Sequence, residues 1–239
     1  MNEKVLRVEI KQAFGLTPAE AGEKKHNIWI GISMSNRKFT PENIEALILW
    51  ALENTKEKVL VWIPGRMQTT NYHYFDKMDR SKALKKAFDE EDRFKKIVQD
   101  ILNNLPEVKR NRVTIANFDD THTPKYIRHQ EIFYREFAEQ GDFYESIMRI
   151  VEDMITARGR TIEKGRAESL SVYVLQELPM FLDGIQTLYS DDLYTLIPYP
   201  GSGKLDELEV DIIDGKRFPE LTKKLKLENK VGILDVEFV

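Results

Sequence analysis

Three side chains in two distant segments have types and positions that suit acyl transfer. Ser33 follows the apolar, β-branched run 28–32, so it lies where a buried strand ends and a side chain becomes accessible. Tyr173 and Glu177 are four residues apart in a helical pattern, which places the phenol and the carboxylate one turn apart on one face. A serine with no histidine near it in sequence needs another activator. A tyrosine and a carboxylate that hold a substrate amine would supply one.

Each of these residues also has a simpler interpretation. A serine in a turn usually hydrogen-bonds the neighbouring backbone, and Ser33 taken alone would be such a residue. Tyr173 and Glu177 taken alone would form an amphipathic helix face with a solvated carboxylate. The nucleophile elbow of hydrolases is absent, because Ser35 stands where its second glycine belongs. Chemistry at these residues is therefore favoured only if further motifs accompany them.

Alternating strands and helices would position these residues. The strands are predicted at residues 27–33, 58–63, 112–118 and 193–199. Helices are predicted from residue 41 after a threonine cap and a proline, and at 81–105, 125–158 and 166–182. We also expect residues 208–213 and 231–238 to add edge strands. Strands separated by helices imply right-handed crossovers, so the predicted fold is α/β and Rossmann-like, with a mainly parallel sheet flanked by helices.

Composition limits the remaining possibilities. The 239 residues can bury a full core, and we expect a single domain over 1–239. The absence of cysteine excludes disulfides, thiolate catalysis and cysteine-bound metal. The first residues lack the apolar stretch of a signal peptide, and the longest apolar run, 46–52, is too short to span a bilayer, so we expect a cytoplasmic protein without a membrane partner. A net charge of −4 does not favour DNA, and any RNA contact must come from a local patch.

Four motifs together resemble the tRNA-dependent cyclodipeptide synthases, over about residues 27–200. They are Gly31-x-Ser33-x-x-Asn36, a strand that ends at Pro64 with Asn71-Tyr72 after it, Tyr173-x-x-x-Glu177-Leu178-Pro179, and Tyr199-Pro200. The resemblance implies the fold of a class I aminoacyl-tRNA synthetase catalytic domain without its ATP chemistry. It also implies an aminoacyltransferase that makes a cyclic dipeptide, a 2,5-diketopiperazine, from two aminoacyl-tRNAs. The expected mechanism is ping-pong, through an aminoacyl-serine and then a dipeptidyl-serine, with no cofactor or metal and in a monomer.

The resemblance assigns roles to individual residues. Ser33 is the expected nucleophile, and Tyr173 and Glu177 bind the substrate amino group, with Glu177 also placed to accept its proton. Gly31 would let the backbone approach the substrate and offer an amide to the acyl oxygen.

A tyrosine at a strand end relays protons in the family. Tyr199 is preferred for this role because Pro200 follows it, although Tyr194 on the same predicted strand is the alternative. The pair of Asn36 with Pro200 suits the family branch in which the asparagine position varies, so Asn36 has a less defined binding role. Two residues near Gly31 could form the walls of the first side-chain pocket or belong to the core: Trp29 and Val61.

A basic stripe follows one arc of the helix predicted at 81–105. Its members are Lys82, Lys85, Lys86, Arg93 and Lys96. The resemblance implies that this helix docks tRNA through phosphate contacts, which carry little sequence information. The alternative is a solvated helix face, because the acidic residues 89–92 interrupt the stripe.

Two other motifs suggest cofactors but fail in detail. Gly201-Ser202-Gly203-Lys204 resembles the end of a phosphate-binding loop, but Pro198 and Leu205 replace essential residues. His122 and His129 match no usual ligand pair for a metal. The other functions left open are a serine-dependent acyl transferase or hydrolase acting on a small activated ester, and a non-catalytic tRNA-binding module.

Overall fold

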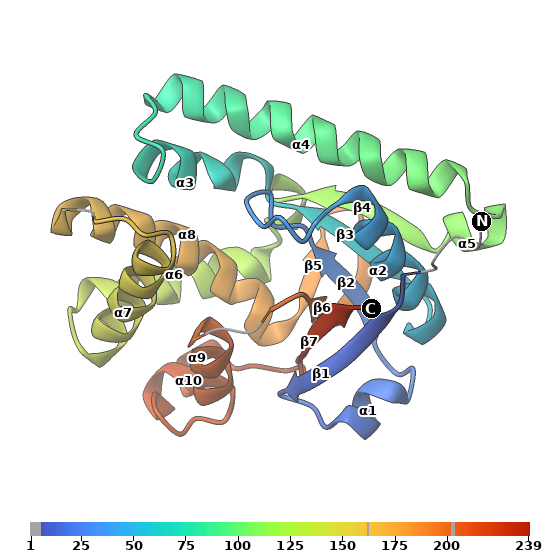
Figure 1. Cartoon of the computed structure of the whole chain (residues 1–239). Coiled ribbons are helices and arrows are strands. Elements are labelled where there is room, and N and C mark those ends of the chain that lie inside the picture. Colours follow the sequence, from blue (N-terminus) through green and yellow to red (C-terminus); the bar gives the residue numbers. More distant parts are fainter. Residues whose placement is uncertain (1–5, 162, 202–203) are drawn as a thin grey trace.

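A mainly parallel β-sheet organises the molecule, a computed structural model that describes residues 6–161, 163–201 and 204–239 (Figure 1). The strands of this part of the chain are β1 (Val8–Phe14), β2 (Asn27–Gly31), β3 (Val59–Ile63), β4 (Val113–Asn117), β5 (Ile185–Thr187), β6 (Ser190–Tyr199) and β7 (Gly232–Phe238). Their order is β1-β7-β6-β2-β3-β4, with β5 paired to β6. Only the pairs β1 with β7 and β5 with β6 are antiparallel among the described strands, which confirms the predicted fold class.

Helices cover both faces of this sheet (Figure 1). The helices of the described chain are α1 (Pro18–Gly22), α2 (Pro41–Asn54), α3 (Thr69–Tyr74), α4 (Arg80–Asn103), α5 (Glu107–Arg110), α6 (Pro124–Ala138), α7 (Asp142–Ala157), α8 (Lys164–Asp183), α9 (Lys204–Ile213) and α10 (Pro219–Leu225). Helix α2 begins as predicted, because Thr40 Oγ1 accepts a hydrogen bond from the Asn43 amide at 3.3 Å and Pro41 follows the cap. None of the helices in the described residues combines the length and apolarity that crossing a bilayer requires.

Alternation along the central strands divides the core between the two faces. Ile28 and Ile30 of β2 pack with α2 and α4, while Trp29 between them points to the opposite face, which α6 and α8 cover. Farther from the sheet, α7, α9 and α10 pack with α6 and α8 in a second apolar cluster. Each face of the sheet is therefore covered by its own set of helices. The helices on the Trp29 face are α6 and α8.

Helix α4 is continuous across its acidic segment, residues 89–92. The reason is that Glu91 points inward, where it is 3% exposed and accepts a hydrogen bond from Asn117 Nδ2 at 2.8 Å. Lys95 Nζ lies 2.5 Å from the same carboxylate, so the buried charge is paired. The basic stripe therefore stands on one straight helix.

Three predicted elements differ in the structure. Residues 125–158 form two helices, α6 and α7, because Gln140 adopts a left-handed φ of 54° ahead of Gly141 and ends the first one. Residues 208–213 belong to helix α9 and are not a strand, since Leu208 and Ile212 are buried one turn apart. Residues 231–238 were predicted to form an edge strand, but β7 lies between β6 and β1. The edge on this side of the sheet is β1. Ser202 and Gly203 of the loop motif lie outside the described residues.

Candidate active site

The carboxyl ends of β2, β3 and β6 meet at one edge of the sheet because these neighbouring strands are parallel. A cavity of about 450 Å³ opens there, between the sheet and helices α7 and α8. It is lined by six of the residues singled out from the sequence: Trp29, Gly31, Ser33, Tyr173, Glu177 and Tyr199. The fold thus brings together side chains that are up to 170 positions apart in the chain.

Ser33 is held between the last hydrogen bond of a strand and a tight turn. The Ile32 amide donates to the Trp62 carbonyl at 2.8 Å, which extends the pairing of β2 with β3 by one residue. The Ser33 carbonyl then accepts a hydrogen bond from the Asn36 amide at 3.1 Å, which closes the turn. Ser33 is half-buried, and the hydrogen bonds of the backbone around it fix its position at the cavity.

One stripe of α8 faces the cavity and the adjoining stripe faces the helices behind it. Tyr173, Glu177 and Phe181 recur every four residues and line the cavity. Val174 and Leu178 pack with α7 and its neighbours instead. The predicted spacing of the phenol and the carboxylate therefore puts both of them in the same cavity.

Tyr173 and Glu177 are coupled by a hydrogen bond between their side chains. Burial, followed by the negative charge of Glu177, raises the pKa of the Tyr173 phenol well above its usual range. Tyr173 therefore keeps its proton and can donate it in a hydrogen bond. The Glu177 carboxylate is a half-buried acceptor beside this phenol, which suits the binding of an ammonium group.

Helix α8 carries a proline in its interior, close to Glu177. Pro179 has no amide hydrogen and crowds the preceding turn, so this stretch needs other support. The Tyr126 hydroxyl donates to the Gln176 carbonyl at 3.0 Å, and Gln130 Nε2 donates to the Tyr126 hydroxyl at 2.9 Å. A side-chain network from α6 thus fixes the backbone next to Glu177.

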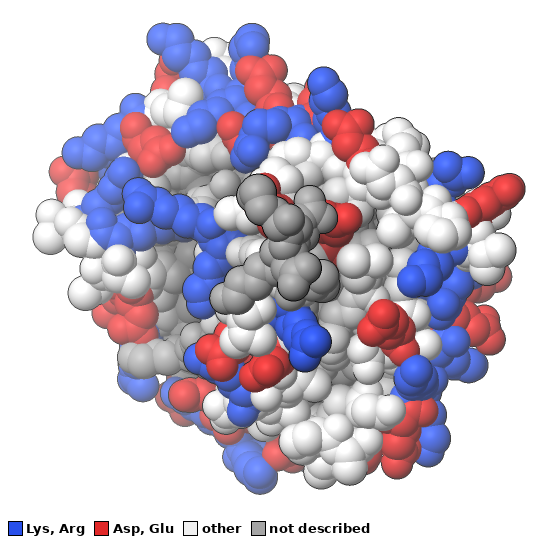
Figure 2. All heavy atoms as spheres, turned by 45° about the vertical axis from the view of Figure 1, so that its right-hand side comes forward, with Lys and Arg blue, Asp and Glu red and all other residues white. Residues whose placement is uncertain are grey.

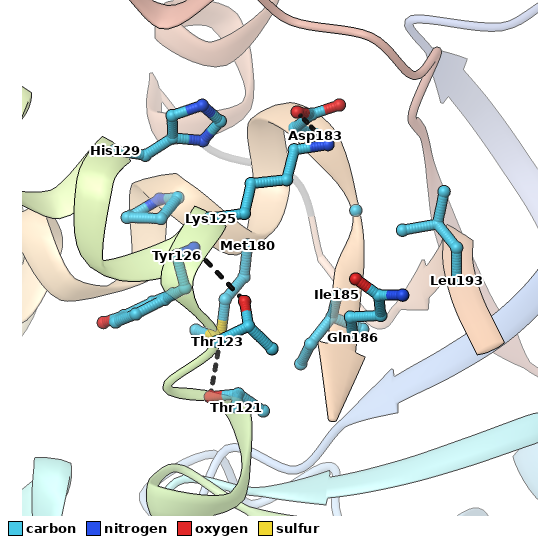
Figure 3. Close-up of a pocket in the computed structure, with 12 residues that line it drawn as sticks. Thr121, Thr123, Lys125, Tyr126, His129, Met180, Asp183, Ile185, Gln186 and Leu193 are labelled. Atoms are coloured by element: carbon cyan, nitrogen blue, oxygen red, sulfur yellow. Dashed lines mark hydrogen bonds and ion pairs between the residues drawn. The ribbon is translucent and has the colours of Figure 1, made fainter. Parts of the chain in front are cut away.

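A buried ion pair holds the end of α8 (Figure 3). Figure 3 shows Lys125 of α6 and Asp183 of α8 pointing toward each other, and Lys125 Nζ lies 2.6 Å from Asp183 Oδ2. The other carboxylate oxygen accepts the Asn229 amide at 2.8 Å. His129, whose ring lies nearby, bonds through Nε2 to the Leu225 carbonyl at 2.9 Å. These contacts satisfy local groups and anchor α8 behind the cavity.

Tyr199 ends β6 at the cavity, and its ring packs 5.7 Å from that of Phe39 between centroids. Asn36 does not line the cavity itself, but its Nδ2 lies 3.5 Å from the Tyr199 hydroxyl. Tyr194, in the middle of β6, pairs with Asn27 at the start of β2, is 1% exposed and does not line the cavity. Geometry thus favours Tyr199 over Tyr194 as the tyrosine of the site.

The two expected pocket walls have different outcomes. Trp29 lines the cavity and meets Trp62 edge to face, with 6.0 Å between ring centroids. The prediction that Val61 forms a wall of the pocket is wrong, because Val61 is fully buried on the opposite face of the sheet, against α2 and α4. Because strand side chains alternate, Trp62 takes the cavity position, opposite Gly31 in the register of β2 and β3. An added Cβ at Gly31 would lie 3.0 Å from the Trp29 ring, so this wall leaves little space beside the glycine.

Arg158, an exposed residue at the end of α7, also lines the cavity, and it is not among the residues predicted from the sequence. Its Nη2 lies 3.3 Å from Ser35 Oγ, and its guanidinium lies 4.0 Å from the centroid of the Phe75 ring. The role of Arg158 at the cavity was not predicted because the pattern indicated one helix over 125–158. In that helix the arginine is simply the last residue. The glycine at 141 was the available signal of a break.

The basic stripe lies outside the cavity on α4. Lys82, Lys85 and Arg93 are exposed there, and each has an acidic neighbour on the same helix or at its cap. Lys86 is half-buried, 3.3 Å from an Asp76 oxygen and 4.1 Å from the Tyr72 ring centroid, and Lys96 is exposed. Figure 2 shows Lys and Arg beside Asp and Glu along its upper edge, where α4 lies. The stripe is thus accessible and partly neutralised.

Metal ligands do not gather anywhere in residues 6–161, 163–201 and 204–239, which contain no group of three or more His, Asp or Glu side chains able to hold an ion. His122 Nδ1 lies 3.2 Å from the Asp119 carbonyl oxygen, while His129 has the backbone partner described above.

Comparisons with known proteins agree on one family. A family model described as cyclodipeptide synthase matches residues 12–196. A search of curated protein sequences returns no match. A cyclodipeptide synthase structure from Staphylococcus haemolyticus is similar at a TM-score of 0.75 and 22% identity, and covers 98% of this chain and 99% of its own.

Two further structures share the fold. A Mycobacterium tuberculosis structure, which relates cyclodipeptide synthetases to type I tRNA synthetases, is similar at a TM-score of 0.72 and 16% identity, covering 99% of this chain and 94% of that one. A structure of a cyclodipeptide synthase from Candidatus Glomeribacter gigasporarum bound to Phe-tRNAPhe is similar at a TM-score of 0.55 and 12% identity. The match covers 87% of this chain and 85% of that one.

Proposed function

Because the chain belongs to the cyclodipeptide synthase family, we propose that it joins two aminoacyl groups through esters on Ser33 and releases them as a cyclic dipeptide. The convergence of Ser33, Tyr173, Glu177 and Tyr199 on one cavity carries this proposal. Its substrates are two aminoacyl-tRNAs used in succession by one monomer, in the cytoplasm where charged tRNA is made. The ester bond of aminoacyl-tRNA supplies the free energy for peptide-bond formation, so the reaction needs no nucleotide.

The first step is transfer of an aminoacyl group to the enzyme. Ser33 Oγ attacks the carbonyl carbon of the first aminoacyl ester, and the bond to the tRNA ribose oxygen breaks as that oxygen takes up a proton. The Gly31 backbone lies in the cavity wall next to this position, where an amide could stabilise the developing oxyanion. Asn36 supports the site through its contact with Tyr199.

The second and third steps make two peptide bonds. The amine of the aminoacyl-serine attacks the second aminoacyl ester, which gives a dipeptidyl-serine and releases the second tRNA. The new terminal amine then attacks the serine ester, closes the ring and frees the Ser33 hydroxyl. Each amine must lose a proton, and because the pKa of an α-amino group is about 8, this loss costs little near neutral pH. Glu177 can hold the ammonium and take part in moving its proton. Tyr173 donates a hydrogen bond in the same cluster, and Tyr199 relays protons during ring closure.

The identity of the product tests this proposal. The purified protein receives two different labelled aminoacyl-tRNAs, singly and together, and the products and the intact protein are examined by mass spectrometry. We expect an aminoacyl adduct on the protein with one substrate, and a cyclic dipeptide containing the supplied amino acids. Free amino acid alone would instead identify a hydrolase, and tRNA binding without product would identify a non-catalytic module.

A further inference from the structure

A second hollow adjoins the catalytic cavity. It is a groove of about 930 Å³ between the connection that joins α3 to α4 and the one that follows α7. Its lining includes the exposed or half-buried side chains of Tyr74, Lys77, Arg160 and Arg166. A groove that combines cations with an aromatic ring suits a single-stranded nucleic acid, because phosphates meet the cations and a base can stack on the ring.

Arg158 stands where the groove meets the catalytic cavity. Its guanidinium packs 4.0 Å from the ring centroid of Phe75, which lines the groove, while Arg158 itself lines the cavity. Its Nη2 lies 3.3 Å from the Oγ of Ser35, which follows Ser33 by two residues in the chain. Aromatic packing and one hydrogen bond thus hold the guanidinium in place before any ligand arrives.

The charges around this junction leave Arg158 available. Two carboxylates line the groove, Asp76 and Glu163, and Asp76 is engaged by Arg160 at 3.4 Å and by Lys86 of the basic stripe at 3.3 Å. Arg160 also hydrogen-bonds the Phe75 carbonyl. The salt bridges of the described residues include none to Arg158, and the Asp76 carboxylate acts on its charge without pairing with it directly. The contact of Lys86 with Asp76 places the groove beside α4.

We propose that Arg158 binds a phosphate of the single-stranded 3′ end of each aminoacyl-tRNA, and that the groove guides this end from α4 into the catalytic cavity. This inference depends on the proposed use of aminoacyl-tRNA. The ester that reacts with Ser33 lies on the terminal ribose, so the preceding phosphate must pass the mouth of the cavity, where Arg158 lies. A guanidinium can grip two phosphate oxygens at once, which sets the position of the ester as well as the affinity.

Binding to two forms of tRNA tests this inference without depending on turnover. Arg158→Ala, Arg158→Lys and a matched control, Arg135→Ala on an exposed part of α6, are compared with the parent. We expect Arg158→Ala to bind intact tRNA about tenfold or more weakly, as loss of a charged hydrogen bond does. Its binding to a tRNA that lacks the single-stranded 3′ end should be unchanged. Arg158→Lys should be intermediate, because it keeps the charge and loses the fork, and Arg135→Ala should match the parent.

Acylation by a small activated aminoacyl ester provides the second measurement. Such an ester has no phosphate, so the loss of Ser33 acylation caused by Arg158→Ala should be much smaller with this ester than with aminoacyl-tRNA. Equal loss of binding to both tRNAs, or no loss to either, would overturn the role of Arg158 at the 3′ end. Loss of acylation by the small ester with normal tRNA binding would instead show that Arg158 shapes the cavity. Failure of the proposed function is separate: the parent would then bind tRNA but yield no cyclic dipeptide.

Discussion

The catalytic cavity and the basic stripe of α4 are both polar, but they are built in opposite ways. The cavity collects Ser33, Tyr199 and the pair of Tyr173 with Glu177 from two strand ends and one helix, and places them in a hollow of about 450 Å³. The stripe comes from one helix, lies outside the cavity and keeps most of its cations beside carboxylates.

This difference separates two kinds of electrostatics. In the cavity, burial changes the chemistry of a group, as the raised pKa of Tyr173 shows. On the stripe, water and salt screen each charge, so single ion pairs contribute little and only their sum can attract a polyanion. We therefore expect cavity variants to lose chemistry at any salt concentration and stripe variants to lose binding in a salt-dependent way.

The largest effect is expected from the nucleophile. Ser33→Ala removes the only atom to which we assign the acyl group, so cyclic dipeptide formation should be abolished while tRNA binding and folding persist. Intact-protein mass spectrometry with one labelled aminoacyl-tRNA should find the adduct on the parent and on a control, Ser169→Ala, which changes a helix serine outside the cavity. Label on the Ser33→Ala protein would place the nucleophile elsewhere.

The next effect concerns the carboxylate of α8. Glu177→Gln keeps the shape of the side chain but removes the charge that holds the ammonium and the base that accepts its proton. The rate of cyclic dipeptide formation should fall by about two to four orders of magnitude. Glu168→Gln on the same helix, whose carboxylate bonds Tyr144 rather than facing the cavity, is the matched control. Near-normal turnover by Glu177→Gln would show that the carboxylate is only a helix-face residue.

The stripe should respond more weakly and only through tRNA. Reversal of Lys82, Lys86 and Arg93 to Glu should lower the use of aminoacyl-tRNA at low salt. It should also flatten the dependence of binding on salt, by a slope of about 0.7 to 0.9 for each lost phosphate contact. Acylation of Ser33 by a small activated ester should be unaffected. If the triple variant used charged tRNA as well as the parent at every salt concentration, α4 would be a solvated surface and tRNA would dock elsewhere.

The smallest effect is a pH dependence of stability set by burial in the cavity. The pKa of Tyr173 is raised in the folded state, so folding favours the protonated phenol. The stabilisation is complete below the unfolded-state pKa of about 10 and is lost as pH rises above that value toward the folded-state pKa. The difference in unfolding free energy between the parent and Tyr173→Phe, measured by denaturant titration, should therefore change above about pH 10 and stay constant from pH 7 to 9. A constant difference up to pH 11 would contradict the raised pKa.

Local patterns in the sequence were enough to predict the strands that end at the site and the helix that faces it. Ser33 was placed after a strand because apolar residues run up to it, and Tyr173 was placed above Glu177 because helical spacing depends only on neighbours. The predicted helix of residues 166–182 is α8, and the strand predicted at 193–199 is the second part of β6. Such features depend on residues within a few turns, so one sequence can reveal them.

Tertiary structure alone decided which side chains meet. Val61 and Trp62 are both apolar strand residues, and only the pairing of β3 with β2 shows that Trp62 shares the face of Trp29. Residues 208–213 read as a strand by composition, yet they form a helix because Leu208 and Ile212 pack on the α8 side of the molecule. Arg158 reaches the cavity because the chain turns after α7 against Phe75. These outcomes depend on contacts between distant segments, which no local pattern records.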